Sequence, residues 1–164
     1  MGSPTSKLSP IGLAGEKVQI WTVRLIASGP VLDAYGALLC AEERDRAGRF
    51  QFEHVRRAYT MSRGALRALL GCYTGCRPQD VVFAYGEKGK PSLAGLSRLR
   101  FKASHSAGLA LYGFALDRDL GVDVEHFRTM NNWEDVARRF FSAREISDLE
   151  SLSPDERTAG FFRY

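Results

Sequence analysis

The stretch LALYGFALDRDLGVDVE, residues 109–125, contains two strand-like patterns separated by a polar turn. Residues 109–116 are almost all apolar, which is typical of a buried strand. Residues 120–125 alternate apolar and polar side chains with a period of two, which is typical of a strand with one buried face. Because Asp117-Arg118-Asp119 lies between them, the sequence predicts an antiparallel hairpin.

Outward from this hairpin, the chain mixes strand and helix patterns. Residues 18–26 and 81–85 are predicted strands, whereas residues 31–39, 56–73 and 133–141 are predicted helices. Gly75 is placed to end the second of these helices. Residues 142–145 have the form of a capping box, and residues 153–156 are a second helix start. LCAEE at residues 39–43 also echoes FSARE at residues 141–145, which is a weak sign of internal duplication.

The composition predicts a compact domain in a reducing compartment. The chain has 164 residues, 45% of them hydrophobic, and no apolar run long enough to span a membrane. Residues 1–16 are polar and predict a flexible tail rather than a secretory signal. Three cysteines, an odd number, predict free thiols. We therefore expect a cytoplasmic protein without membrane association.

The charge predicts a polyanionic partner without identifying it. The net charge is +4, and arginines are concentrated in residues 44–67. Such a face suits a nucleic acid, a nucleotide cofactor or an acidic protein. The chain lacks an aromatic-rich RNA-binding signature and a recognisable recognition helix, so a nucleic-acid-binding module is disfavoured.

Asp123 and Glu125 are candidate metal ligands. Their spacing on a predicted strand places both carboxylates on one face. Two hard oxygen ligands can hold Mg²⁺ and leave positions for phosphate and water. The alternative is a half-exposed strand with a polar outer face.

Three further segments carry candidate site residues. Ser104-His105-Ser106 offers a histidine between hydroxyls, which could bind phosphate or shuttle a proton, or be a hydrogen-bonded structural histidine. Lys90-Pro91 follows a glycine and could contact a nucleotide, or belong to an ordinary loop. Glu145 could be a general base or assist the metal, although its place in a capping box already gives it a structural role. A Ser-His-Asp hydrolase is excluded because neighbouring residues on a strand face opposite ways and no G-x-S-x-G elbow is present.

The order of these motifs resembles that of the 4′-phosphopantetheinyl transferases of the surfactin-synthetase-activating type. The similar segments are RAYTMSRGALRALLGCYTG (57–75), GKPSL (89–93), FKASHSAG (101–108), GVDVE (121–125) and RRFFSAREISDL (138–149). The resemblance covers about residues 18–164. SHS followed by GVDVE and then FFS-x-x-E at this separation is specific, whereas each motif alone is not.

The resemblance implies an α+β fold of two pseudo-duplicated halves. After the tail of residues 1–16, residues 17–116 would form the first half and residues 117–164 an incomplete second half that carries the metal-binding strand. The implied reaction transfers 4′-phosphopantetheine from coenzyme A to a serine of an acyl or peptidyl carrier protein. The enzyme would be a Mg²⁺-dependent transferase, that is, a holo-carrier-protein synthase.

The resemblance also implies roles for individual residues. Asp123 and Glu125 would bind the metal, and Ser104 and His105 would hold the coenzyme A phosphates. In the same way, cofactor contacts are expected at Lys90, Pro91 and Arg46. Glu145 and His105 would be the catalytic side chains.

The match departs from the family at the end of the chain. Relatives continue into a W-x-x-K-E-A helix, and here nothing follows Tyr164. The chain is therefore expected to be C-terminally truncated, and to self-associate, receive the rest in trans, or be inactive. The alternative function is an impaired homologue that only binds coenzyme A or a carrier protein.

Overall fold

Two units make up the fold, Met1–Val124 and Glu125–Tyr164. The computed structural model describes residues 12–13, 15–26, 29–86, 89–95, 98–128 and 133–163. Both helices and strands are present, so the predicted α+β class is confirmed. The cysteines are free thiols, as predicted. Within the described residues, no helix is both long and apolar enough to cross a membrane.

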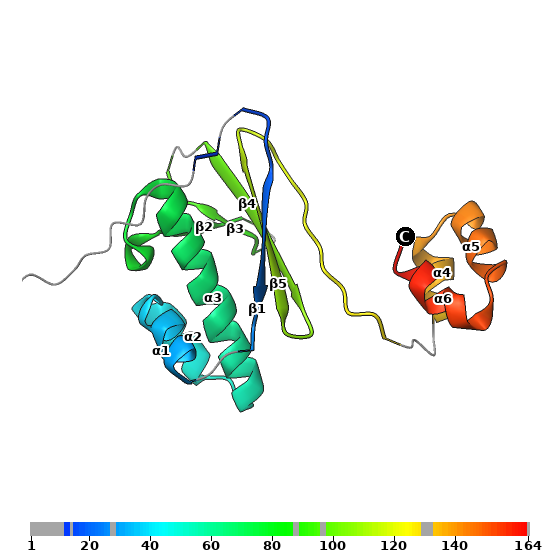
Figure 1. The fold of residues 1–164 in the computed structure, drawn as a ribbon, viewed down its shortest axis with the longest axis horizontal. Coiled ribbons are helices and arrows are strands. Elements are labelled where there is room, and N and C mark those ends of the chain that lie inside the picture. Colours follow the sequence, from blue (N-terminus) through cyan, green and yellow to red (C-terminus); the bar gives the residue numbers. More distant parts are fainter. Residues whose placement is uncertain are drawn as a thin grey trace, which may run out of the picture. The chain divides into compact units, whose positions relative to one another are not determined.

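The first unit is built on a three-stranded antiparallel sheet (Figure 1). β1 (Gln19–Arg24) and β4 (Leu99–Ser106) flank β5 (Leu109–Leu116). A two-residue loop joins β4 to β5, and both of its residues, Ala107 and Gly108, have positive φ. This conformation matches the right-handed twist of an antiparallel hairpin.

The prediction that residues 109–116 form a hairpin with residues 120–125 was wrong. Residues 109–116 form β5 as predicted, but they pair with β4 and β1. Since both edges of β5 are occupied, residues 120–125 have no strand to pair with there, and they run without regular secondary structure. They still alternate between half-buried and exposed side chains, as a strand would.

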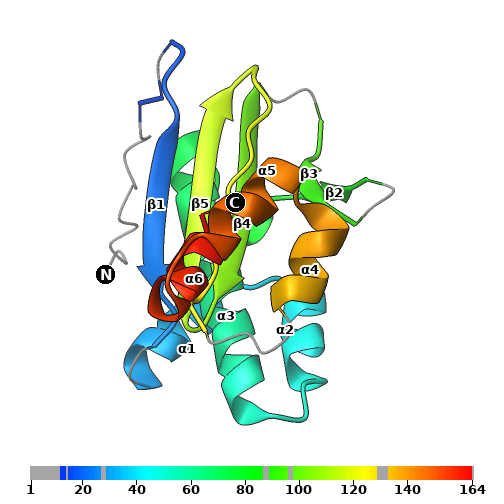
Figure 2. The same cartoon turned by 90° about the vertical axis from the view of Figure 1, so that its right-hand side faces the viewer.

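A long helix covers one face of the sheet. α3 (Glu53–Thr74) lies behind the three strands in Figure 2. The hydrophobic core lies between them and combines apolar residues of α3 (Met61, Ala65, Leu66, Leu70) with residues of the strands (Phe101, Ala110, Tyr112, Phe114). α3 ends where Gly75 adopts a left-handed conformation (φ 70°), as the sequence predicted.

Two short helices pack on α3. α1 (Gly29–Ala37) approaches so closely that a Cβ at Gly64 would stand 2.6 Å from the carbonyl oxygen of Tyr35. α2 (Ala41–Gly48) was not predicted as a helix, because its charged sequence lacks an apolar stripe. The 3-10 turn η1 (Pro78–Asp80) then leads to a small antiparallel pair, β2 (Phe83–Tyr85) and β3 (Pro91–Leu93), of which β3 lies against β4.

An apolar contact holds residues 120–124, here called the 120–124 strip, against the other face of the sheet. Gly113 of β5 has no side chain, and a Cβ there would stand 2.6 Å from Leu120 Cδ1 and 2.6 Å from Val122 Cγ1. The missing side chain therefore makes room for two apolar ones. This contact fixes the position along β5 at which the Asp123 side chain projects from the strip.

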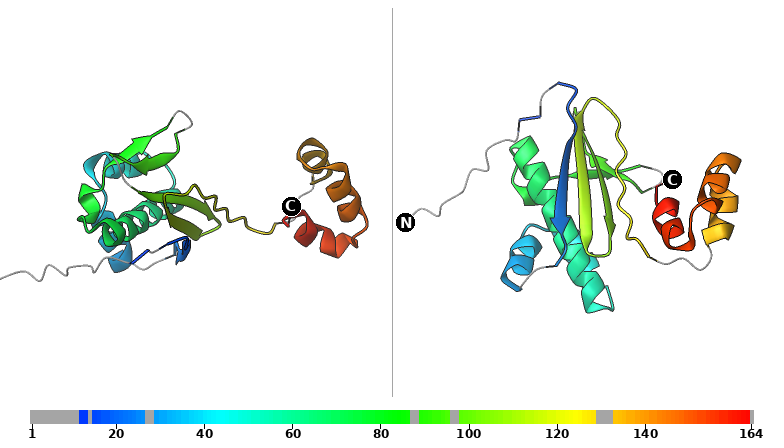
Figure 3. Two further views of the ribbon diagram at one scale, coloured as in Figure 1. Left: turned by 90° about the horizontal axis from the view of Figure 1, so that it is seen from above. Right: turned by 45° about the vertical axis from the view of Figure 1, so that its right-hand side comes forward.

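The second unit consists of three short helices, coloured orange to red in Figure 3. They are α4 (Trp133–Phe140), α5 (Ala143–Glu150) and α6 (Pro154–Phe161), and α5 and α6 begin where the sequence predicted. Leu149 is fully buried beside Gly160, which leaves no room for a side chain. Aromatic rings also pack together in this unit, with Phe161 lying 5.2 Å from Phe141 and 5.5 Å from Phe162 between ring centroids.

Candidate functional site

A cavity in the first unit brings together four of the predicted site residues. It has a volume of about 310 Å³ and is lined by residues 90–91, 101–104 and 120–123. We call it the β3–β4 cavity. Pro91 is the first residue of β3 and Lys90 directly precedes it, Ser104 lies on β4, and Asp123 lies in the 120–124 strip. Three segments that are distant in sequence thus supply a cation, a hydroxyl and a carboxylate to one hollow.

Ser104 fixes the position of Asp123. Its hydroxyl donates to Asp123 Oδ1 at 2.7 Å and accepts from the backbone N–H of Val124 at 3.2 Å. A hydroxyl has one donor, and here Asp123 takes it. Ser104 can donate to a phosphate only after it releases this carboxylate. In this arrangement the two hydrogen bonds of Ser104 hold the 120–124 strip against β4.

His105 lies apart from these groups. It follows Ser104 on β4, and successive side chains on a strand point to opposite faces. In register it pairs with Ala110, which faces the core, while Ser104 pairs with Leu111. The His105 side chain is exposed and does not line the β3–β4 cavity. The structure therefore brings Ser104, but not His105, to Asp123, and the role of His105 stays a prediction.

Lys102 is a cavity residue that the sequence motifs did not reveal. It lies two residues before Ser104 on β4, so both project from the same face. This spacing was the available signal. Within the described part of the chain, neither Lys90 nor Lys102 has an acidic partner within ion-pair distance. Asp123 is the one carboxylate lining the cavity, so the lining carries two positive charges and one negative charge.

The other predicted acids lie in the second unit. Glu125 is exposed. Glu145 accepts from the backbone N–H of Ser142 at 2.7 Å, and Ser142 Oγ accepts from the Glu145 N–H at 3.3 Å. The predicted capping box of α5 is therefore present. The hydrogen bond from the Ser142 backbone, together with the one to the Ser142 side chain, holds the pKa of Glu145 below its ordinary value. A carboxylate held in this way is a weakened base.

Asp123 fits a metal that takes most of its ligands from outside the protein. Carboxylate oxygens are the donors that Mg²⁺ prefers, and Mg²⁺ commonly binds one or two of them together with phosphates and water. Across the described residues, no group of three or more His, Cys, Asp or Glu side chains could hold a metal ion. The donor set therefore suits a metal–phosphate complex and not a cage made by the protein alone.

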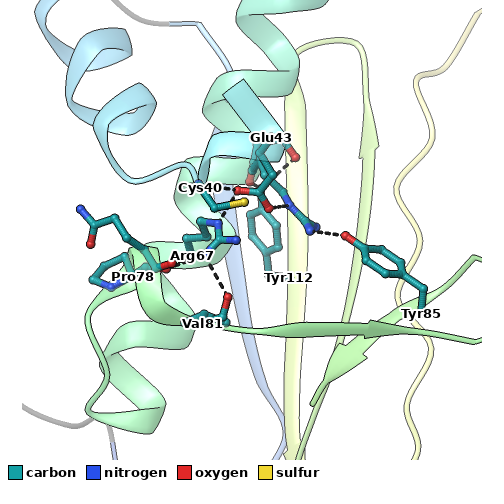
Figure 4. Close-up of polar contacts among 10 residues, drawn as sticks. Cys40, Glu43, Arg67, Pro78, Val81, Tyr85 and Tyr112 are labelled. Carbon is teal, nitrogen blue, oxygen red and sulfur yellow. Dashed lines mark hydrogen bonds and ion pairs between the residues drawn. The ribbon is translucent and has the colours of Figure 1, made fainter. Parts of the chain in front are cut away.

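Most of the arginines in residues 44–67 are committed to internal contacts. Arg46, the predicted cofactor contact, has its guanidinium carbon 5.6 Å from the Tyr59 ring centroid, and it does not line the β3–β4 cavity. Arg56 pairs with Glu53 at 2.8 Å on the surface. The largest commitment is a buried network around Glu43 (Figure 4).

Glu43 is a buried carboxylate held by two arginines of α3. Arg63 Nε contacts it at 2.5 Å, and the buried Arg67 also donates to it. Arg67 further donates to the carbonyls of Pro78 (2.7 Å) and Val81 (3.1 Å), which ties η1 to α3. Burial alone would raise the pKa of Glu43, but the hydrogen bonds from the two arginines outweigh it and the pKa is lowered. This network joins α2, α3 and the approach to β2.

Comparison with known proteins gives the following matches. The 4′-phosphopantetheinyl transferase HetI of Nostoc sp. strain PCC 7120 is 39% identical over 155 residues, which is 93% of this chain and 65% of HetI. A putative 4′-phosphopantetheinyl transferase of Synechocystis sp. strain PCC 6803 is 34% identical over 147 residues (88% and 59%). A Bacillus subtilis 4′-phosphopantetheinyl transferase is 29% identical over 130 residues (79% and 57%). No family model matches the chain. The chain spans about two thirds or less of the length of these three relatives.

Proposed function

Because the chain belongs to the 4′-phosphopantetheinyl transferase superfamily, we propose that it transfers 4′-phosphopantetheine from coenzyme A to a serine hydroxyl of an apo carrier protein. Adenosine 3′,5′-bisphosphate would leave. The observation that carries the proposal is the convergence of Lys90, Pro91, Ser104 and Asp123 on the β3–β4 cavity. A hollow with two lysines, a hydroxyl and a metal-type ligand suits a pyrophosphate-bearing donor.

In this proposal, the chain's residues bind and orient the donor. The Lys90 ammonium neutralises phosphate charge, and Pro91 fixes the backbone against which the nucleotide lies. Ser104 presents the Asp123 carboxylate in one orientation through its 2.7 Å hydrogen bond. Positioning of this kind is the main contribution that a protein makes to phosphoryl transfer.

Mg²⁺ is the proposed metal, held by Asp123 with Glu125 as the second predicted ligand. When bound, it supplies positive charge against the phosphate oxygens and withdraws electrons from the phosphorus. The acceptor serine must lose its proton on attack. Glu145 is the side chain predicted to take this proton, and His105 is the second predicted catalytic side chain. The lowered pKa of Glu145 means that this carboxylate is ionised at neutral pH and accepts a proton only weakly.

The pseudo-duplicated fold remains part of the proposal, with residues 17–116 as the first half and residues 117–164 as a partial second half. The echo between residues 39–43 and 141–145 supports it. Both segments open an eight-residue helix, α2 and α5. In both, a glutamate at the third helical position accepts the N–H of the capping residue, Glu43 from Cys40 at 3.1 Å and Glu145 from Ser142 at 2.7 Å.

A second candidate function is binding of coenzyme A or a carrier protein without turnover, or turnover only after self-association. The observation that favours it is the lowered pKa of Glu145, which makes the predicted proton acceptor a weak base.

Incubation with coenzyme A, Mg²⁺ and an apo carrier protein tests the proposal, with the intact mass of the carrier as readout. We expect the carrier to gain one phosphopantetheine arm, and Asp123→Asn to abolish the gain. Calorimetric binding of coenzyme A without any mass gain would support the second candidate. If neither binding nor transfer is observed, both candidate functions are refuted.

A further inference from the structure

One lysine of the β3–β4 cavity has no structural explanation. Lys102 lies on the outer strand β4, pairs in register with Gly113, and is half-buried. The space above Gly113 is filled by Leu120 and Val122. Lys102 thus shares the cavity wall with apolar side chains, beside which an unbalanced charge is costly.

Some other cations of the same unit do have an acidic partner. Arg98 pairs with Asp117 at 2.6 Å, and Arg118 with Glu16 at 3.3 Å. In the part of the chain that the structure describes, no carboxylate lies within ion-pair distance of Lys102. The nearby Asp123 has its Oδ1 occupied by the Ser104 hydroxyl. A cation that is left unbalanced at a cavity wall is suited to an anionic ligand.

We propose that Lys102 is a phosphate-binding residue that faces Lys90 across the β3–β4 cavity and selects ligands carrying a pyrophosphate group. Two lysines, one on β4 and one directly before β3, match two linked phosphates better than one isolated phosphate. Lys102 and Ser104 lie about 7 Å apart along one face of the strand, and Ser104 is hydrogen-bonded to Asp123. The phosphate nearer Lys102 therefore lies beside the Asp123 carboxylate. This inference rests on the proposed function only in identifying the pyrophosphate as that of coenzyme A.

Calorimetric titration of the 164-residue chain with inorganic pyrophosphate, in Mg²⁺ and low salt, is the direct test. We expect Lys102→Gln to weaken binding about tenfold and to make it less dependent on salt, since one charge-assisted contact is lost. Lys102→Arg should keep binding within about threefold, because the charge remains. Lys17→Gln is the matched control, since it removes the same charge from an exposed site outside the cavity and should change nothing.

The outcomes separate this inference from the proposed function. Unchanged pyrophosphate binding by Lys102→Gln, or no binding by the wild-type chain, overturns the inference. If coenzyme A binds the wild-type chain but is unaffected by the variant, the role of Lys102 fails while the proposed function stands. If pyrophosphate binds through Lys102 but coenzyme A does not, the proposed function fails instead. Should Lys102→Gln not fold by circular dichroism, Lys102→Met, which keeps the aliphatic stem, decides the question.

Discussion

Replacing Glu43 by glutamine should strongly destabilise the first unit. Glu43 is 6% exposed and Arg67 is 2% exposed, so the charge of Arg67 would remain buried without a counter-charge. The glutamine amide keeps one acceptor oxygen, but its NH₂ group would face a guanidinium donor.

The expected loss is about 3–5 kcal/mol, the cost of removing one partner of a buried ion pair. It is large compared with the roughly 5–15 kcal/mol of a typical domain. Arg67 keeps its hydrogen bonds to the carbonyls of Pro78 and Val81, which places the expectation near the lower end. Replacing Glu43 and Arg67 together by methionine should recover part of the loss, because the charge of Arg67 is then gone, while Arg63 loses its counter-charge but keeps its hydrogen bond to the Tyr85 hydroxyl.

Urea unfolding followed by tryptophan fluorescence is the assay, in a Trp133→Phe background so that Trp21 alone reports. Trp21 lies in β1, and its indole N–H donates to the Tyr73 hydroxyl at 2.8 Å. Glu53→Gln is the control, since it removes the same charge from a pair whose carboxylate is 65% exposed, where under about 1 kcal/mol is expected. An equal loss in both variants, or a loss below about 1 kcal/mol at Glu43, would refute this reasoning.

The same network gives a pH dependence. The pKa of Glu43 is lowered from its ordinary value of 4.5 in the folded state. Its contribution is therefore complete above the unfolded-state pKa and is lost as the pH falls through the folded-state pKa. The difference in unfolding free energy between wild type and Glu43→Gln should be constant near neutral pH and shrink below about pH 4.5. A difference that grows on acidification would contradict the lowered pKa.

Three further substitutions test the packing and the cavity. Gly113→Ala places a methyl group 2.6 Å from two side chains of the 120–124 strip; it should cost about 1–3 kcal/mol in urea unfolding and weaken Mg²⁺-dependent coenzyme A binding. Gly64→Ala brings a Cβ 2.6 Å from a backbone oxygen of α1 and should cost at least as much, whereas Gly48→Ala, with open space around it, should leave unfolding unchanged or slightly stabilised. Ser104→Ala removes the two hydrogen bonds that hold the 120–124 strip against β4 and should weaken Mg²⁺-dependent coenzyme A binding about threefold to tenfold in calorimetry, with about 1 kcal/mol lost in unfolding.

The elements themselves were largely predictable, and their pairing was not. β5 matches residues 109–116 to the residue because an apolar run between turn signals is a strong local pattern. Its partner was mispredicted because an alternating pattern such as 120–125 records which face is buried, not which strand lies alongside. The loop at Ala107-Gly108 and the alternation in residues 99–104 were signals for the true hairpin.

The candidate site shows the same limit. The motifs located Lys90, Ser104 and Asp123 because their order along the chain is distinctive, and the structure gathers them in one cavity. Lys102 was missed, although strand periodicity places it on the face of Ser104. The buried role of Glu43 was beyond the sequence, since its partner arginines lie 20 and 24 residues away on another helix.

The most direct test of the central claim is calorimetric titration of the chain with coenzyme A, with and without Mg²⁺, for wild type and Asp123→Asn. The β3–β4 cavity as described predicts that the wild type binds coenzyme A and that removing Mg²⁺ weakens binding at least about tenfold, the expected cost of losing a charge-assisted contact to phosphate. Asp123→Asn should show the same weakening, with no further effect when both changes are combined, because both remove one interaction. Coenzyme A binding that is indifferent to Mg²⁺ and to Asp123, or no binding at all, would contradict the account.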